Sequence, residues 1–308
     1  MPLNLKKYLS KVQMGEMQQC GNMAVVPLFY EDSGKADYLT LKEAMRKKAV
    51  AVNEVSPGAK IVELVADVQD NLNVFLLDGE ELSGGRANRI LNASILLSGK
   101  SRTAIPVSSA EQGRWHLSRS KSFSVSDNLA SYLIRTALNR SISNSLKAER
   151  RYNSDQYAVW SGISDLQAKA KIRSDTHAMR DIFDASKKDM ERYLRAFARR
   201  PGQKGMLVFI NGEVAGFDII SRESAFSACR GKLVSSYCLD AMYFKKQRRP
   251  VPDLIRAKNF LDRISSCKSA KYKSVGSGSD YRFEGKDFTG AALEVDGEVL
   301  HMTFLRAA

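Results

Sequence analysis

Short apolar segments separated by turn-forming residues dominate the first third of the chain. Several segments are β-branched, and Gly, Asn, Asp and Ser punctuate them, which is typical of strands. We expect strands at residues 24–29, 60–66, 74–77, 89–97 and 102–107. One helix should interrupt them at 41–49, with Thr40 as its N-cap and Glu43 completing a capping box.

The middle third is helical and basic. Apolar side chains recur at helical spacing over residues 128–151 and 187–199, and Pro201-Gly202 should end the second of these helices. In the last third, residues 206–220 and 291–305 each read as a hairpin around an Asn-Gly or Asp-Gly turn. A further helix is expected at 253–265.

These elements add up to an α+β fold with antiparallel-rich strands in the N- and C-terminal thirds and a basic helical middle segment. The strand-rich pattern stops near Ser126. We therefore expect a strand-rich region at 1–126, followed by a helical segment and an α+β region at 127–308, with the two packed as one unit.

Composition narrows the class of protein. The chain has 308 residues, 44% of them hydrophobic, and 48 Lys and Arg against 34 Asp and Glu give a formal net charge of +14. This charge favours anionic partners. No run approaches the roughly 18 apolar residues of a membrane span, and no apolar signal region follows the basic N-terminus. Four scattered cysteines suit neither a disulfide scaffold nor a zinc site. We expect a cytoplasmic protein without a membrane partner and with no metal site of its own.

Two polar segments stand out as candidate chemistry. Residues 78–92 read DGEELSGGRANRILN between apolar segments, and residues 111–115 read EQGRW. Arginine offers a planar fork that fits phosphate and carboxylate, and nearby carboxylates can serve as acids and bases. Glu80 and Glu81 point to opposite faces if they lie on a strand, so one of them, preferably Glu81, would pair with Glu111. The structural alternative is a turn with a surface ion-pair network.

The same segments carry a resemblance. Together they resemble the signature of the ADP-ribosylglycohydrolase and rhodanese-phosphatase-superfamily-associated protein domain family. The matching positions are Gly79, Glu80, Glu81, Leu82, Gly85, Arg86, Asn88, Arg89, Ile105, Pro106, Val107, Ser108, Glu111, Gln112, Gly113, Arg114 and Trp115. Three positions depart from the family pattern: Ala87 replaces Gln, Ser109 replaces Cys and Ala110 replaces Val. The absence of this Cys argues against an essential thiol.

The resemblance implies a nucleotide-like ligand, because the family is linked by gene association to NAD and ADP-ribose metabolism. It also implies that the two segments line one site. In that site, Arg86, Arg89 and Arg114 would hold phosphate, Asn88 and Gln112 would orient hydroxyl groups, and Trp115 would stack or support.

Two further ligand candidates lie near the C-terminus. Residues 274–282 read SVGSGSDYR, where Gly276 and Gly278 could present backbone N–H groups to a phosphate and Arg282 could close over it. His301, inside the last strand, could act as an acid or base. The alternatives are a Gly/Ser turn and a hydrogen-bonded packing histidine.

The leading hypothesis is a protein that binds and processes an ADP-ribose-like nucleotide, by hydrolysis or transfer at a ribosyl or phosphoryl bond. Mg²⁺ could accompany the phosphates of the ligand. The first alternative is a nucleotide-binding protein without turnover, in which the carboxylates are structural partners of the arginines. The second is nonspecific nucleic-acid binding through the basic helices. It predicts that the affinity for nucleic acid falls steeply with salt concentration and changes little when Arg89 is mutated.

Overall fold

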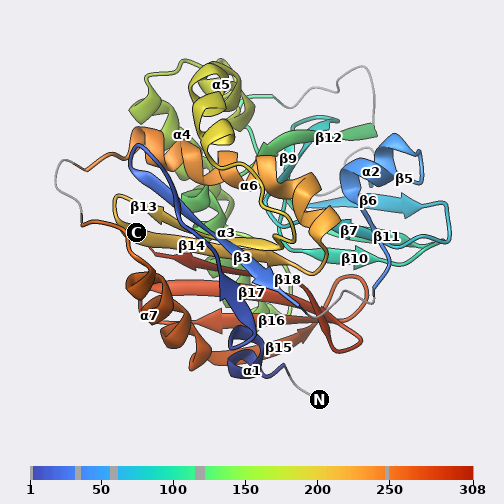
Figure 1. The fold of residues 1–308 in the computed structure, drawn as a ribbon. Helices are drawn as coiled ribbons and strands as arrows, with labels where there is room; N and C mark the ends of the chain where they lie inside the picture. Colours follow the sequence, from blue (N-terminus) through green and yellow to red (C-terminus); the bar gives the residue numbers. More distant parts are fainter. Residues whose placement is uncertain (1–2, 32–35, 56–61, 115–121, 247–249, 308) are drawn as a thin grey trace.

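A computed structural model describes residues 3–31, 36–55, 62–114, 122–246 and 250–307, and Figure 1 shows the path of the chain. Its seven helices are α1 (Leu5–Leu9), α2 (Leu41–Arg46), α3 (Tyr132–Glu149), α4 (Gln156–Ala170), α5 (Met179–Ala196), α6 (Glu223–Tyr243) and α7 (Leu254–Ser265), all within these described ranges. None of them is both long enough and apolar enough to cross a membrane.

Six strands close into a small antiparallel barrel in the order β11-β6-β5-β12-β8-β9. They are β5 (Val50–Glu54), β6 (Glu63–Val68), β8 (Glu80–Gly84), β9 (Arg89–Leu91), β11 (Arg102–Ser109) and β12 (Ser122–Leu129). A three-stranded sheet, β10-β7-β4, shares the barrel's apolar core. It consists of β4 (Leu39–Thr40), β7 (Val74–Leu76) and β10 (Ile95–Leu97).

The large sheet has nine strands and draws them from both ends of the chain. Eight follow the order β1-β3-β13-β14-β18-β17-β16-β15, and β2 also pairs with β3. They are β1 (Val12–Met14), β2 (Gln18–Cys20), β3 (Met23–Tyr30), β13 (Gly205–Ile210), β14 (Glu213–Ile220), β15 (Lys268–Lys273), β16 (Ser279–Glu284), β17 (Phe288–Val295) and β18 (Glu298–Arg306). Every pairing in this sheet is antiparallel.

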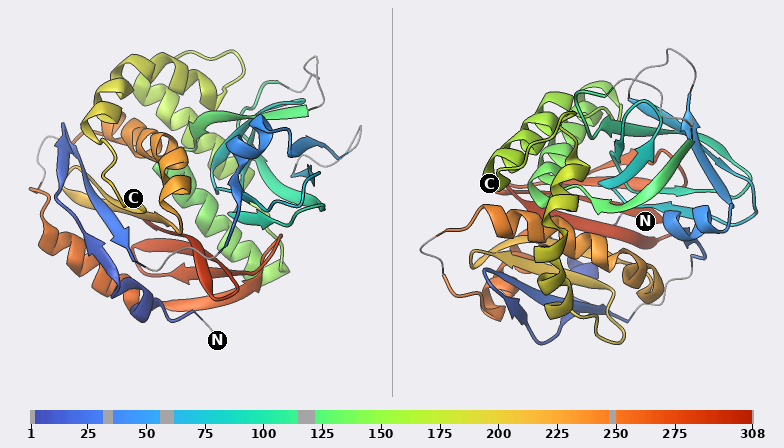
Figure 2. Two further views of the ribbon diagram at one scale, coloured as in Figure 1. Left: turned by 45° about the vertical axis from the view of Figure 1, so that its right-hand side comes forward. Right: turned by 90° about the horizontal axis from the view of Figure 1, so that it is seen from above.

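Helices cover both faces of the large sheet. Side chains of α1 and α7 pack with one set of apolar sheet residues, including Val26 and Phe217. Helices α3 to α6 pack with the opposite set, including Val25 and Val208. Figure 2 shows the barrel beside this assembly, next to α3 and α6. The α+β class is therefore confirmed, and the second apolar core, between the sheet and α3–α6, also contacts the barrel.

Local signals account for many element boundaries. Thr40 caps α2 and forms the expected capping box with Glu43. Both predicted hairpins form as β13–β14 and β17–β18, and both residues of each turn have positive φ, as a tight primed turn requires. Asp253 caps α7, where a helix was expected.

Two expectations were wrong. The strand expected at 89–97 is two strands, β9 in the barrel and β10 in the small sheet. Residues 92–94 interrupt them, and the side chains of Asn92 and Ser94 bond to Tyr152, between α3 and α4, and to His301 on β18. Helices α4 and α6 were not expected, and α5 begins at Met179, before the predicted start. Helix α6 is buried on nearly every side, so it lacks the polar face that produces a helical pattern in sequence.

Candidate functional site

The two polar segments meet at one end of the barrel. Arg89 on β9 pairs with Leu82 on β8 and with Ser109 on β11. Directly paired residues share a face of a sheet, and Leu82 belongs to the apolar core of the barrel. Arg89 therefore points into the barrel at the end where β8 turns into β9. Because Glu111 follows β11 by two residues, it also lies at this rim.

Glu111 organises the rim. Its Oε1 accepts a hydrogen bond from the backbone N–H of Asn88 at 2.5 Å and two from the Arg114 guanidinium, at 3.0 Å from Nε and 2.7 Å from Nη2. Arg114 Nη2 also donates to Asn88 Oδ1 at 3.0 Å. Glu111 is buried, whereas 28% of the Arg114 side chain is exposed to solvent. A group at the protein surface can therefore reach Arg114. We call Glu54, Arg86, Asn88, Arg89, Glu111 and Arg114 the rim cluster.

Positive charge exceeds negative charge in the rim cluster. The guanidinium of Arg89 is buried, and this burial lowers its pKa. The carboxylates of Glu54 and Glu111 oppose that shift, whereas the charges of Arg114 and Arg86 add to it. Glu54 additionally accepts the backbone N–H of Arg86 at 3.1 Å. Three arginines thus share two carboxylates, an arrangement that a bound anion would stabilise.

Glu81 lies beside the rim cluster on the outer face of the barrel, where it pairs with Ile90. Its Oε2 accepts hydrogen bonds from Ser126 Oγ at 2.9 Å and Asn128 Nδ2 at 2.8 Å, whereas Oε1 has no hydrogen-bond partner among the described residues. Burial raises the pKa of Glu81, and the charge of Glu111 adds to the shift. A carboxyl group with a raised pKa and an ion-paired carboxylate thus lie within electrostatic range of each other.

Glu80 has a different environment. It points to the opposite side of β8 from Glu81, as alternation along a strand requires. Its carboxylate forms a buried ion pair with Lys232 of α6 at 2.8 Å and accepts the backbone N–H of Leu77. These contacts join the barrel to α6 and do not include the rim cluster.

The remaining residues of the second segment are less informative. The backbone N–H of Gln112 donates to Thr176, and its side chain is exposed. Trp115, for which we expected a stacking role, lies outside the described residues.

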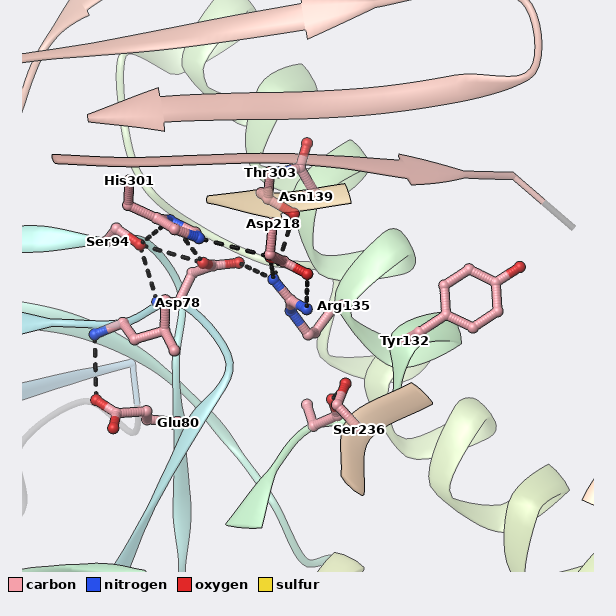
Figure 3. Close-up of polar contacts among 12 residues, drawn as sticks. Asp78, Glu80, Ser94, Tyr132, Arg135, Asn139, Asp218, Ser236, His301 and Thr303 are labelled. Carbon is pink, nitrogen blue, oxygen red and sulfur yellow. Dashed lines mark hydrogen bonds and ion pairs between the residues drawn. The ribbon is translucent and has the colours of Figure 1, made fainter. Parts of the chain in front are cut away.

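His301 and Arg282 lie away from the rim cluster, around a second polar site. Figure 3 shows Ser94, His301, Asp218 and Arg135 joined by consecutive contacts between the barrel and the large sheet. We call these four residues, with Asp78, the central cluster. The cluster borders a small pocket, with room for about one water molecule, that also contacts Arg282.

Within this second site, Arg282 is bound to a carboxylate. Its Nε and Nη2 donate to Asp280 Oδ2 at 3.1 and 2.6 Å. The backbone N–H of Ser277, in the Gly/Ser segment expected to hold phosphate, donates to Leu96 of the small sheet. The segment therefore packs against β10.

Sequence analysis missed the centre of this second site. The fully buried Asp218 accepts two hydrogen bonds from the fully buried Arg135, at 3.2 Å from Nη1 and 2.6 Å from Nη2. The Tyr237 hydroxyl donates to it at 2.6 Å. The Arg135 guanidinium holds the pKa of Asp218 well below its usual range. The sequence does contain one sign of this site. Asp218 is the only charged residue in the apolar segment 214–220, and a charged residue in such a segment indicates a buried, paired charge.

No group of three or more His, Cys, Asp or Glu side chains in the described part of the chain is arranged to hold a metal ion. The four cysteines are free thiols.

Comparisons with known proteins give one match. Neither the curated proteins nor the solved structures include a match to the chain. The model of one domain family matches residues 11–305, which spans the barrel, the large sheet and the rim cluster. The chain therefore belongs to the family of the ARG and Rhodanese-Phosphatase-superfamily-associated Protein domain.

Proposed function

We propose that the rim cluster binds the phosphates of an ADP-ribose-like nucleotide and that the protein cleaves or transfers the ribosyl bond of this ligand. The observation that carries the proposal is the excess of arginine over carboxylate at one end of the barrel, with Arg89 buried and Arg114 within reach of solvent. Barrel mouths are frequent ligand sites, and a desolvated arginine binds an anion more strongly than an exposed one does. Membership of this family supports a nucleotide-related role.

The two carboxyl groups suit general acid–base chemistry. Glu81, whose pKa is raised by burial, would donate a proton to the group that leaves the anomeric carbon. Glu111, ion-paired with Arg114, would accept a proton from the attacking water or alcohol. The new bond forms at the anomeric carbon as the bond to the leaving group breaks. An alcohol leaving group departs with the proton of Glu81, whereas the nicotinamide of NAD⁺ would leave as a neutral base without one.

Product analysis tests this assignment. The protein is incubated with NAD⁺ and with a glycosidic conjugate of ADP-ribose, with and without Mg²⁺, and the products are separated by chromatography. We expect release of ADP-ribose from both substrates. Glu111→Gln should slow it for both, and Glu81→Gln should slow it for the glycosidic conjugate, each by about 10²-fold or more, as general acid–base catalysis predicts. The control is Glu284→Gln, which alters an exposed ion pair with Lys147.

Two results would count against the assignment. Equal turnover in wild type and Glu111→Gln would show that Glu111 does not act as the base in the reaction. Intact ligand recovered from the wild-type protein would overturn turnover altogether and favour the alternative of binding only, in which the Glu111–Arg114 ion pair has a structural role.

A further inference from the structure

An open cavity lies between α5 and the end of α6. Its volume is about 460 Å³, which is within the usual range of small-molecule binding sites. One wall comes from residues 188–193 of α5, and the other comes from residues 242–245 at and just beyond the end of α6. No residue that lines it belongs to the rim cluster or the central cluster. We call this cavity the α5–α6 pocket.

Hydrogen bonds hold the two walls of this pocket in place. The hydroxyl of Tyr243 on α6 lies 2.7 Å from the hydroxyl of Ser186 on α5. The buried Asn211 bonds to the backbone on both sides of Lys245. Its Nδ2 donates to the carbonyl of the preceding residue at 2.8 Å, and its Oδ1 accepts the N–H of the following residue at 3.2 Å. The pocket is therefore preformed, so a ligand would not have to order the backbone there.

Positive charge exceeds negative charge in the α5–α6 pocket. Three cationic side chains, those of Lys188, Arg192 and Lys245, line it together with one carboxylate, that of Asp189. The ammonium groups of Lys188 and Lys245 form no hydrogen bond or ion pair with any other residue in the described ranges. Cations that line a concave surface attract an anion more strongly than the same charges on a flat surface, because the walls focus their field.

The other groups in the pocket narrow the class of anion. Met242 and the ring of Tyr243 offer an apolar surface that suits a flat ring. The carboxylate of Asp189 would repel a phosphate, but it can accept hydrogen bonds from hydroxyl groups such as those of a ribose. A ligand with phosphate groups, a sugar and an aromatic base has a partner for each of these groups.

We propose that the α5–α6 pocket binds a nucleoside diphosphate or triphosphate. Lys188, Arg192 and Lys245 surround the phosphate chain, Asp189 accepts the ribose hydroxyls, and the base lies against Met242 and Tyr243. A free terminal phosphate adds charge that the three cations can match, whereas both phosphates of ADP-ribose are esterified and carry less. The pocket thus differs from the rim cluster in place and in ligand, and the proposal does not depend on the function of the rim cluster.

Photolabelling locates the site. Full-length protein is irradiated with 2-azido-ADP, and the labelled peptide is identified by mass spectrometry. We expect label on the segment that contains Met242 and Tyr243. Excess ADP should suppress this label, and the same concentration of ADP-ribose should suppress it less. Label confined to residues 79–114 at the barrel rim, or suppressed equally by ADP-ribose, would overturn the proposal.

Calorimetric titration then measures the role of the lysines. ADP is titrated into protein that carries Arg114→Gln, so that binding at the rim contributes little. Adding Lys188→Gln and Lys245→Gln together should weaken ADP binding by about tenfold or more, because two charged donors are lost. Pyrophosphate and adenosine should each bind at least about tenfold more weakly than ADP does, since each lacks part of the contacts.

Lys187→Gln is the matched control, because Lys187 is the neighbouring exposed lysine of α5 and does not line the pocket. It should bind ADP as the parent protein does. The proposal is overturned if ADP does not bind, if the double lysine variant binds it as tightly as the parent does, or if Lys187→Gln causes an equal loss. Pyrophosphate that binds as tightly as ADP would also overturn it, because the sugar and base would then contribute nothing.

Discussion

Buried charged side chains in this protein are compensated in different ways. Asp218 has a guanidinium, and Glu80 has an ammonium group within 2.8 Å. Among the described residues, the donors to Asp240 of α6 are neutral and lie at the start of α3; they include the backbone N–H of Leu133 at 3.3 Å and the Ser131 hydroxyl at 3.4 Å. Burial raises the pKa of Asp240 to about 7. Ionised Asp240 is therefore the less favourable state in the folded protein.

This shift predicts the pH dependence of stability. Between about pH 4 and pH 7 folded Asp240 keeps its proton while the unfolded chain has released it, so its contribution to the free energy of unfolding falls as pH rises. Asp240→Asn removes the effect. The stability of this variant relative to wild type should rise by on the order of 1.4 kcal/mol per pH unit in that window, measured by urea unfolding. A difference that is constant with pH would contradict the assignment.

The sequence predicted part of this arrangement through the family resemblance, which implied that the two polar segments line one site. Arg89, Glu111 and Arg114 do share the barrel rim. The partners of Glu80 and Asp218 could not be predicted, because Lys232 and Arg135 come from helices distant in sequence. Whether the rim binds a nucleotide stays a prediction.

At the scale of elements, turns and caps were predictable because their signals lie within a few residues. The primed turns and the Thr40 capping box are examples. The two strands within 89–97 were read as one because their separation depends on which sheet each joins. Gly84, where β8 ends, has φ of +144°, and an added Cβ would lie 2.4 Å from the backbone oxygen of Ser122 on β12.

Gly84→Ala should therefore weaken the closure of the barrel at the rim. We expect a loss of about 2 kcal/mol or more in the free energy of unfolding, from backbone strain and the clash with β12. Gly231→Ala in α6 is the matched control, because a Cβ there meets nothing within 4 Å, and it should be neutral or stabilising by up to about 1 kcal/mol. Equal unfolding midpoints for the two variants in urea would refute this account of the rim.

The arrangement of the whole molecule depends on contacts between distant parts of the chain. Strand β3, near the N-terminus, pairs with β13, and the C-terminal β18 pairs with β14, so one sheet unites both ends. Composition and periodicity predicted the α+β class but carry no information on these pairings. The formal net charge of +14 is a property of the entire surface, and only the structure distinguishes the rim, where arginines outnumber carboxylates.

Calorimetric titration with ADP-ribose tests the role of the rim most directly. We expect one site per chain and, in Arg114→Gln, at least about tenfold weaker binding, since a hydrogen bond from a charged group contributes about 1.5–3 kcal/mol. Arg263→Gln, which removes an exposed arginine paired with Asp287, should bind as the wild type does. The same affinity for wild type and Arg114→Gln, or an equal loss in both variants, would contradict an anion site at the barrel rim.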